Sequence, residues 1–329
     1  MLKKYFLCIV AALILAPLMN WGYELFLNPG NLFFNECIEI TKAWEKEVRK
    51  QDEKCYIFVG GSEVRMGIEP TAMLEKHGIR AVNAGLQAAN GLRCNTQMGL
   101  NFLQPGDTLV LSVFAGRTNI GLGTSRSGIH CCLAHLGSKC FFVNGGIIPL
   151  DISLLSNLLY GSSSEISVYI MRLLTRPDCI YRYSCAKNAK ITKSGRVEVF
   201  IKHDIPIHHR KKTDELPRQV FNGVDALIRD VEAACQQRGA NMIAYLPRRC
   251  ISSTYRPVNA IMALYLTDLG IPVLKDQHLG TWENNSSFSD SSEHLNIEAG
   301  YEFSTYLAKL IKEEDYWTRE ELLHIIHGR

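Results

Sequence analysis

The strongest constraint on the fold is an alternation of short apolar segments with longer amphipathic ones. The short segments predict strands at residues 56–59, 81–83, 108–114, 241–246 and 271–274. Between them, helices are predicted at residues 70–77, 221–237 and 257–269, and a further amphipathic helix is predicted at residues 35–50. Strands that alternate with helices pair in parallel and carry helices on both faces. The sequence therefore predicts an α/β domain built on one parallel sheet.

Size and charge narrow the class of protein. The chain has 329 residues, of which 47% are hydrophobic, and this is enough to bury one sizeable core. The formal net charge is only +3 and both signs are spread along the sequence, so no basic face is expected and nucleic acid is excluded as a partner. The basic run at residues 208–212 is interpreted as a solvated loop in preference to a contact with an anionic glycan. We expect one main domain at residues 28–329.

The amino terminus carries a strongly apolar run at residues 5–21, which Lys3 and Lys4 precede. This pattern is typical of an uncleaved membrane anchor or of a cleaved signal peptide. We favour the anchor because no small-x-small cleavage site follows Leu15. Residues 1–27 are therefore expected to be a signal-anchor or signal peptide. In both cases the main domain lies outside the cytoplasm, either periplasmic or at the cell surface when anchored, or secreted when cleaved.

Residues 120–218 interrupt the alternation of strands and helices. This stretch holds an apolar helical piece at residues 152–174 and a hairpin whose turn is Lys193, Ser194 and Gly195. We interpret it as a long insertion at the carboxyl edge of the sheet that forms a substrate groove, a dimer contact or a packing flap.

Cysteine usage leaves the compartment open. Five of the eleven cysteines lie in the insertion: Cys131, Cys132, Cys140, Cys179 and Cys185. Disulfides and buried thiols are both compatible with them. Their spacing fits no standard zinc-ligand pattern, so a zinc site is disfavoured.

The first candidate for chemistry is Ser62, in the sequence Gly60, Gly61, Ser62 and Glu63 directly after the first predicted strand. A serine there lies at the carboxyl end of a parallel strand, where ligands bind in open α/β sheets. The glycines let the backbone turn sharply enough to present its hydroxyl. The alternative interpretation is a turn with a capping serine. A partner that can act as a base is needed to decide between them.

The second candidate is His294, in a loop just before the predicted final helix, for which Asn296 is the expected cap. Asp290 precedes it in the same loop. A histidine so placed can turn its imidazole into a cleft while a carboxylate holds its tautomer, as a serine nucleophile requires. A lone loop histidine is usually a bystander, but together with Ser62 and Asp290 the groups for acyl transfer are complete.

A nucleotide site is disfavoured, because neither G-x-x-x-x-G-K-[ST] nor G-x-G-x-x-G occurs.

Taken together, these motifs resemble the SGNH (GDSL-like) hydrolase superfamily. The resemblance rests on Gly-x-Ser after the first strand, a glycine after the second, a Gly/Asn turn after the third, and Asp-x-x-x-His-Leu-Asn before the last helix. The most similar members are anchored, extracytoplasmic proteins related to alginate O-acetylation and to D-alanyl transfer onto teichoic acids. The resemblance covers residues 56–311. It implies a flavodoxin-like three-layer α/β/α sandwich with a five-stranded parallel sheet.

The resemblance also implies roles for the catalytic residues. Ser62 would be the nucleophile, His294 its general base and Asp290 the residue that orients the imidazole. The interval from Asp290 to His294 is one residue longer than the commonest form of the motif. Glu293 and Asp276 therefore remain alternatives for orienting the histidine.

Three groups are implied as donors to a tetrahedral oxyanion: the backbone N–H of Ser62, the backbone N–H of Gly85 and the side-chain amide of Asn119. Two positions depart from the family pattern. Gly61 stands where an aspartate usually precedes the serine, and Asn119 comes one residue later than the usual asparagine and lacks the aspartate that follows it.

Further substrate contacts are suggested at Arg65, Gln87 and Asn90. Arg65 is expected to contact a substrate anion or to form a structural ion pair at the start of a helix. Gln87 and Asn90 are candidates for binding sugar hydroxyls, although ordinary loop polarity explains them equally well.

The function expected from these features is hydrolysis or transfer of an acyl ester on a cell-envelope glycan, with no cofactor and no metal. The alternative is a catalytically inactive, glycan-binding or assembly subunit of a polysaccharide modification or export system, with other envelope proteins as partners.

Overall fold

A four-stranded parallel sheet forms the centre of the protein. The computed structural model describes residues 2–23, 29–49, 53–113, 142–143, 146–147, 189–199, 206–207, 224–289 and 291–328. The sheet has the order β2-β1-β3-β8, and its strands are β1 (Tyr56–Val59), β2 (Ala81–Asn83), β3 (Thr108–Ser112) and β8 (Asn241–Tyr245). Every neighbouring pair is parallel. The predicted α/β class with a parallel sheet is confirmed.

The fifth predicted strand is shorter in the structure than the sequence suggests. Residues 271–274 form only an isolated parallel bridge beside β8, which pairs Ala244 with Val273. Leu274 turns instead to an antiparallel bridge with Tyr316 near the carboxyl terminus. Among the described residues the sheet therefore has four strands rather than five.

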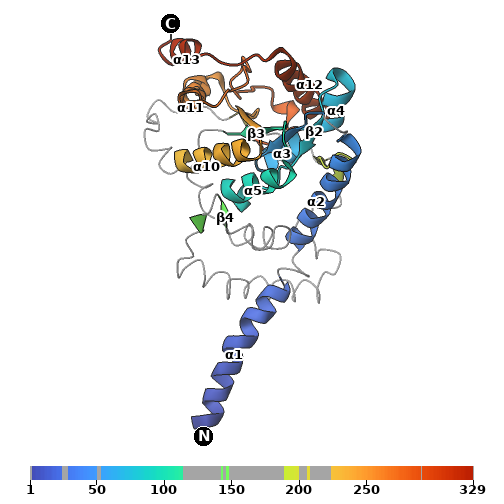
Figure 1. Ribbon diagram of the computed structural model, residues 1–329, viewed down its shortest axis with the longest axis vertical. Coiled ribbons are helices and arrows are strands. Elements are labelled where there is room, and N and C mark those ends of the chain that lie inside the picture. The colour runs from blue at the N-terminus through green and yellow to red at the C-terminus, as the bar shows by residue number, and fades with distance from the viewer. Residues whose placement is uncertain are drawn as a thin grey trace.

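Helices cover both faces of the sheet (Figure 1). One face packs against α2 (Pro29–Val48), α5 (Leu92–Phe102), α10 (Val224–Gln237) and α11 (Arg256–Asp268), and α13 (Arg319–Ile326) packs on α11. The opposite face packs against α3 (Ser62–Gly67), α4 (Pro70–His77) and α12 (Ile297–Glu313). Neighbouring strand residues such as Ile57 and Phe58 point to opposite faces and are both fully buried. Burial on both faces explains why the strands are continuously apolar.

Two predicted capping residues lie at helix termini, one at the end of α4 and one at the start of α12. The α4 helix has the predicted bounds, and Gly78 ends it in the left-handed conformation with φ at +71°. At the start of α12, the Oδ1 atom of Asn296 accepts a hydrogen bond of 2.9 Å from the Ala299 N–H, so the predicted cap is confirmed. The cap also marks the end of the loop that carries His294.

The described part of the insertion contains two short hairpins. The predicted hairpin is confirmed: β6 (Ala189–Ile191) and β7 (Val197–Val199) are antiparallel, and Gly195 in its turn has φ at +86°. A second hairpin pairs β4 (Phe142–Val143) with β5 (Gly146–Ile147). The predicted helical piece at residues 152–174 and the basic run at residues 208–212 lie outside the described residues, as do five cysteines: Cys131, Cys132, Cys140, Cys179 and Cys185.

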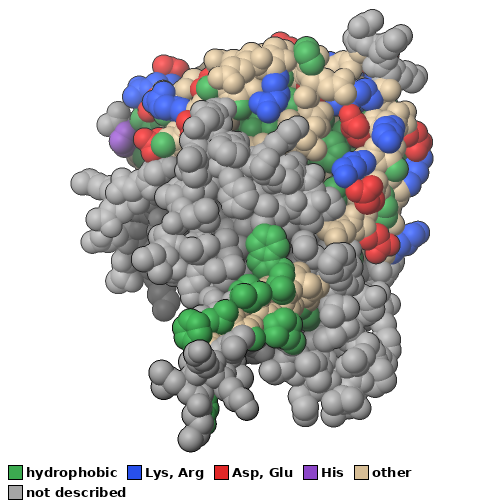
Figure 2. Space-filling view, turned by 60° about the horizontal axis from the view of Figure 1, so that its bottom comes forward, with side chains coloured by type: hydrophobic (Ala, Val, Ile, Leu, Met, Phe, Trp, Pro, Cys, Tyr) green, Lys and Arg blue, Asp and Glu red, His purple; other side chains and the backbone are tan. Residues whose placement is uncertain are grey.

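The amino-terminal helix α1 (Leu2–Gly22) extends away from the α/β body (Figure 1). It carries the large exposed hydrophobic side chains of the described surface, and Figure 2 shows such side chains gathered on one side of the molecule. They are Tyr5, Phe6, Ile14, Leu15, Leu18, Met19 and Trp21. By length and hydropathy, none of the helices in the described part of the chain meets the requirements of a membrane span.

Candidate active site

Two glycines shape the turn that presents Ser62. The turn follows β1 directly, and Ser62 is the first residue of α3. A Cβ atom on Gly60 would overlap Val64 and lie 2.8 Å from Ser112 Cβ, and one on Gly61 would lie 2.9 Å from the backbone nitrogen of Ala88. No side chain fits at either position, so the two glycines are required for this close approach. The turn leaves Ser62 half-buried at the carboxyl edge of the sheet.

The buried side chain of Glu63 stabilises the same turn through hydrogen bonds. Its carboxylate is 6% exposed, and Oε1 accepts hydrogen bonds from the Gly61 N–H at 2.8 Å and from Ser112 Oγ at 3.2 Å. Burial, followed by the negative charge of Glu63, raises the pKa of the nearby Tyr245, so that phenol stays neutral. The sequence analysis did not assign Glu63 a role. A carboxylate between a buried strand and the apolar side of a helix is the signal that could have indicated one.

Replacing Gly60 with alanine is expected to destabilise the protein by about 2 kcal/mol, because an added methyl group in a filled core forces its neighbours apart. Thermal unfolding followed by circular dichroism measures the loss. Gly67→Ala, at the end of the helix that follows the turn, is the matched control, since its Cβ would meet only Leu295 Cδ1 at 3.8 Å, an ordinary contact. Equal melting temperatures for the two variants would contradict the packing argument.

The structure brings His294 to Ser62. The Nε2 atom of His294 lies 2.8 Å from Ser62 Oγ, although 232 positions separate the two residues in the chain. The loop around His294 is closed by an antiparallel bridge between Phe288 and Leu295. The His294 carbonyl accepts a 2.9 Å hydrogen bond from the Ser289 N–H. Both side chains are half-buried. A hydroxyl and an imidazole at this distance have the geometry of a nucleophile and its general base.

The three carboxylates considered for orienting His294 differ in what the structure shows of them. Asp290 lies outside the described residues. Glu293 accepts a 3.1 Å hydrogen bond from Arg249 Nη2. Asp276 is 2% exposed and accepts the backbone N–H groups of two residues that follow it, at 3.2 and 3.3 Å. Glu293 and Asp276 therefore have partners that do not depend on the histidine.

The three expected oxyanion donors differ in what the structure shows of them. Ser62 is the first residue of α3, and the N–H groups of Val64 and Arg65 in the same turn donate to the Gly61 carbonyl at 3.2 Å, so of this turn only the first N–H groups are candidates to meet an anion. The N–H of Gly85 instead donates to Asn83 Oδ1 at 3.1 Å. A Cβ on Gly85 would lie 2.7 Å from the backbone nitrogen of Arg65, so this glycine permits close packing on α3. The Gly85 N–H thus has a protein partner in this structure, and its role as an oxyanion donor stays a prediction. Asn119 lies outside the described residues.

Asn83, which sequence reasoning missed, bonds the end of α3, the helix that begins at Ser62. It ends β2, is fully buried, and its Nδ2 atom donates to the carbonyls of Val64, Arg65 and Ile68 at 3.0, 3.3 and 2.8 Å. These carbonyls lie at the end of α3, where helical partners run out. An asparagine in an otherwise apolar strand is the signal that could have indicated this role.

The three residues suggested as substrate contacts are bonded to other protein groups. Arg65 is 2% exposed, and its Nη1 atom donates to Thr41 Oγ1 at 3.1 Å and to the Gly195 carbonyl at 2.6 Å. It therefore joins α2 to the hairpin, which is a structural role, although its acceptors are a hydroxyl and a carbonyl and not the expected ion-pair partner. Gln87 donates to Asn90 Oδ1 at 3.2 Å, and Asn90 is fully buried. Asn90 thus exposes no side-chain surface to a sugar in this structure, which fits the alternative of ordinary loop polarity.

The described thiols do not compete with Ser62 as nucleophiles. Burial raises the pKa of Cys55 to about 11 and that of Cys235 to about 12, and it also raises the pKa values of Cys37 and Cys250. These four thiols therefore stay protonated at neutral pH. Cys94, on α5, is in a disulfide.

In the described part of the chain, no three histidine, cysteine or carboxylate side chains cluster as metal ligands would. No protein-family model matches the chain, and no curated protein or solved structure matches it either. The function therefore has to be inferred from the geometry of the site.

Proposed function

We propose that the chain is a serine hydrolase or O-acyltransferase of the SGNH type, acting on acyl esters through Ser62. The observation that carries the proposal is the 2.8 Å distance between Ser62 Oγ and His294 Nε2. A serine hydroxyl is a weak nucleophile at its ordinary pKa. It becomes reactive when an imidazole within hydrogen-bonding distance accepts its proton during attack.

In the proposed reaction, Ser62 Oγ attacks the acyl carbonyl carbon while His294 Nε2 takes the hydroxyl proton. The resulting oxyanion is stabilised by the Ser62 N–H and by the Asn119 amide, each such donor being worth about 3 kcal/mol. The imidazolium, oriented by Asp290, returns its proton to the departing alcohol. Water or a sugar hydroxyl then releases the acyl group from Ser62 by the same steps in reverse.

We further propose that the fold is the flavodoxin-like sandwich, with residues 271–274 as the fifth strand. The sheet order β2-β1-β3-β8 supports this, because it follows the first four strands of the flavodoxin-like order. The parallel bridge between Ala244 and Val273 lies where a fifth strand would pair with β8.

An acylated cell-envelope glycan is the proposed substrate, with α1 attaching the protein to a membrane and the α/β domain outside the cytoplasm. The exposed hydrophobic side chains of α1 support attachment to an apolar phase. The disulfide at Cys94 supports an oxidising compartment, because structural disulfides rarely persist in the cytosol.

Labelling with a fluorophosphonate probe tests the proposal. We expect the full-length protein, purified in detergent, to be labelled once per chain, with the modified peptide mapping to Ser62, and to turn over p-nitrophenyl acetate. Ser62→Ala should show neither reaction. Absence of labelling in the wild type, or equal labelling of Ser62→Ala, would contradict the proposal and favour an inactive glycan-binding or assembly subunit.

A further inference from the structure

Arg196, at the start of the second strand of the insertion hairpin, bonds both segments that carry the reacting side chains. The residue is 1% exposed. Its Nε atom donates to the Met66 carbonyl of α3 at 2.8 Å. Its Nη2 and Nη1 atoms donate to the carbonyls of Asn296 and Ile297 at 2.8 and 3.2 Å, at the start of α12. One guanidinium therefore connects the helix that begins at Ser62 with the helix that follows the His294 loop.

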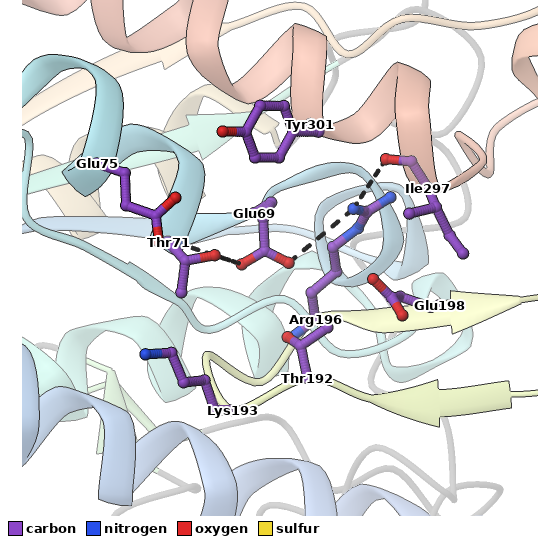
Figure 3. Close-up of a pocket in the computed structure, with 9 residues that line it drawn as sticks. All are labelled: Glu69, Thr71, Glu75, Thr192, Lys193, Arg196, Glu198, Ile297 and Tyr301. Atoms are coloured by element: carbon purple, nitrogen blue, oxygen red, sulfur yellow. Dashed lines mark hydrogen bonds and ion pairs between the residues drawn. The ribbon is translucent and has the colours of Figure 1, made fainter.

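Glu69 holds the guanidinium from the side of α4. Its Oε2 atom lies 4.0 Å from Arg196 Nη1, and its Oε1 atom accepts hydrogen bonds from Ser194 Oγ at 2.5 Å and Thr71 Oγ1 at 2.6 Å. Figure 3 shows Arg196 between Glu69 and Ile297, beside a cavity of about 250 Å³ whose lining includes neither Ser62 nor His294. The arginine thus acts on the site through the backbone and not by facing a substrate.

The chemistry of the position suits arginine alone. A guanidinium is planar and presents several N–H donors in fixed directions, so it can bond three carbonyls at once, whereas a lysine ammonium is a single point. Burial lowers the pKa of Arg196 and the nearby Glu69 and Glu198 oppose the shift, so the group remains charged. The α12 helix makes room for it with Gly300, where a Cβ would lie 2.7 Å from Arg196 Cζ.

We propose that Arg196 is a positioning residue that sets the distance between Ser62 and His294, so that the insertion hairpin helps to make the site competent. This inference rests on the proposed function for its kinetic readout. The chain just after α3 has a second connection to α12, because Ser304 Oγ on α12 accepts the N–H of Glu69, two residues beyond the end of α3, at 2.7 Å. Loss of the guanidinium bonds should therefore loosen the site without separating the helices. Since a displacement of about 1 Å costs about 100-fold in rate, the effect on turnover is measurable.

Two variants remove the guanidinium bonds by different routes. Arg196→Lys keeps the positive charge but loses the planar set of N–H donors. Gly300→Ala keeps the arginine but puts a methyl group where the guanidinium lies. Alanine has a higher helix propensity than glycine, so this substitution does not by itself weaken α12. In the full-length protein, both are expected to lower kcat for p-nitrophenyl acetate by about 10- to 100-fold with KM changed less than about twofold. Both should also slow labelling by a fluorophosphonate in proportion to kcat.

Arg49→Lys is the matched control. Arg49 is also largely buried, and it bonds the Asp107 carboxylate at 3.0 Å and the Phe102 carbonyl at 2.9 Å. Asp107 precedes β3, so these bonds lie at the amino edge of the sheet, opposite the edge that carries Ser62. This variant should lower the melting temperature while kcat per folded molecule stays at the wild-type value.

Crystal structures of the wild type and Arg196→Lys give a readout that does not depend on activity. The proposal expects the separation of Ser62 Oγ and His294 Nε2 to grow from 2.8 Å to beyond about 3.5 Å, the limit of a hydrogen bond. An unchanged separation in Arg196→Lys, or wild-type kcat in both variants, would overturn it. A wild type that never reacts with the probe would defeat the proposed function instead, and the measured separation would still decide the role of Arg196.

Discussion

Replacing His294 with alanine is expected to lower kcat for p-nitrophenyl acetate by about 10⁴-fold, because Ser62 then has no base within reach to accept its proton. The residual rate should come from substrate binding and from the oxyanion donors. His294 is half-buried in a loop that is held by backbone hydrogen bonds and by the side chains of other residues, such as Glu293, so the fold should survive the substitution. Steady-state kinetics together with thermal unfolding measure both parts of the prediction.

His324→Ala is the control for this substitution. His324 is exposed on α13, and its removal should leave both kcat and the melting temperature unchanged within error. If His294→Ala also retains the wild-type kcat, then the contact of 2.8 Å between the two side chains has no catalytic meaning.

Replacing Asn83 with alanine is expected to lower the free energy of unfolding by about 3 kcal/mol. The substitution removes this donor from the carbonyls of Arg65 and Ile68 and leaves the Gly85 N–H without its acceptor, all in a buried place. The Val64 carbonyl keeps its bond from the Ile68 N–H at 3.0 Å. Each buried polar group left unpaired costs about 1 to 3 kcal/mol, and partial relaxation keeps the total below the sum. Urea denaturation at pH 7 measures the change.

A second substitution separates the two halves of the amide. Asn83→Asp keeps an acceptor for Gly85 but places a buried carboxylate oxygen against the three carbonyls, so it should be at least as destabilising as alanine. Asn241, the exposed first residue of β8, supplies the control, since Asn241→Ala should change stability by no more than about 0.5 kcal/mol. An Asn83→Ala variant as stable as this control would contradict the assignment.

Three buried polar side chains fix the position of the short helix that begins at Ser62. Glu63 holds the turn before α3, Asn83 holds its end, and Arg196 connects it to α12. A six-residue helix is too short to be stable by itself, because nucleation consumes most of what its few hydrogen bonds contribute. The surrounding side chains therefore decide where Ser62 points.

Local chemistry in the sequence was enough to predict most of the elements. The bounds of β1, β2 and α4, the hairpin turn at Gly195 and the cap at Asn296 follow from apolar runs, glycine conformations and side-chain caps that act within a few residues. The segment at residues 271–274 was overestimated, because an apolar run predicts burial and does not reveal how many ladder bonds it makes.

By itself, the sequence determined the α/β class, the parallel sheet and the pair of residues worth testing, since these depend on periodicity and on residue chemistry. Only the tertiary structure decided that Ser62 and His294 meet, that Arg65 and Gly85 are committed to packing, and that Arg196 connects α3 to α12. The physical reason is that a hydrogen bond is decided by distance in space. The partners of these groups lie far away in the chain or on another element, where no local pattern records them.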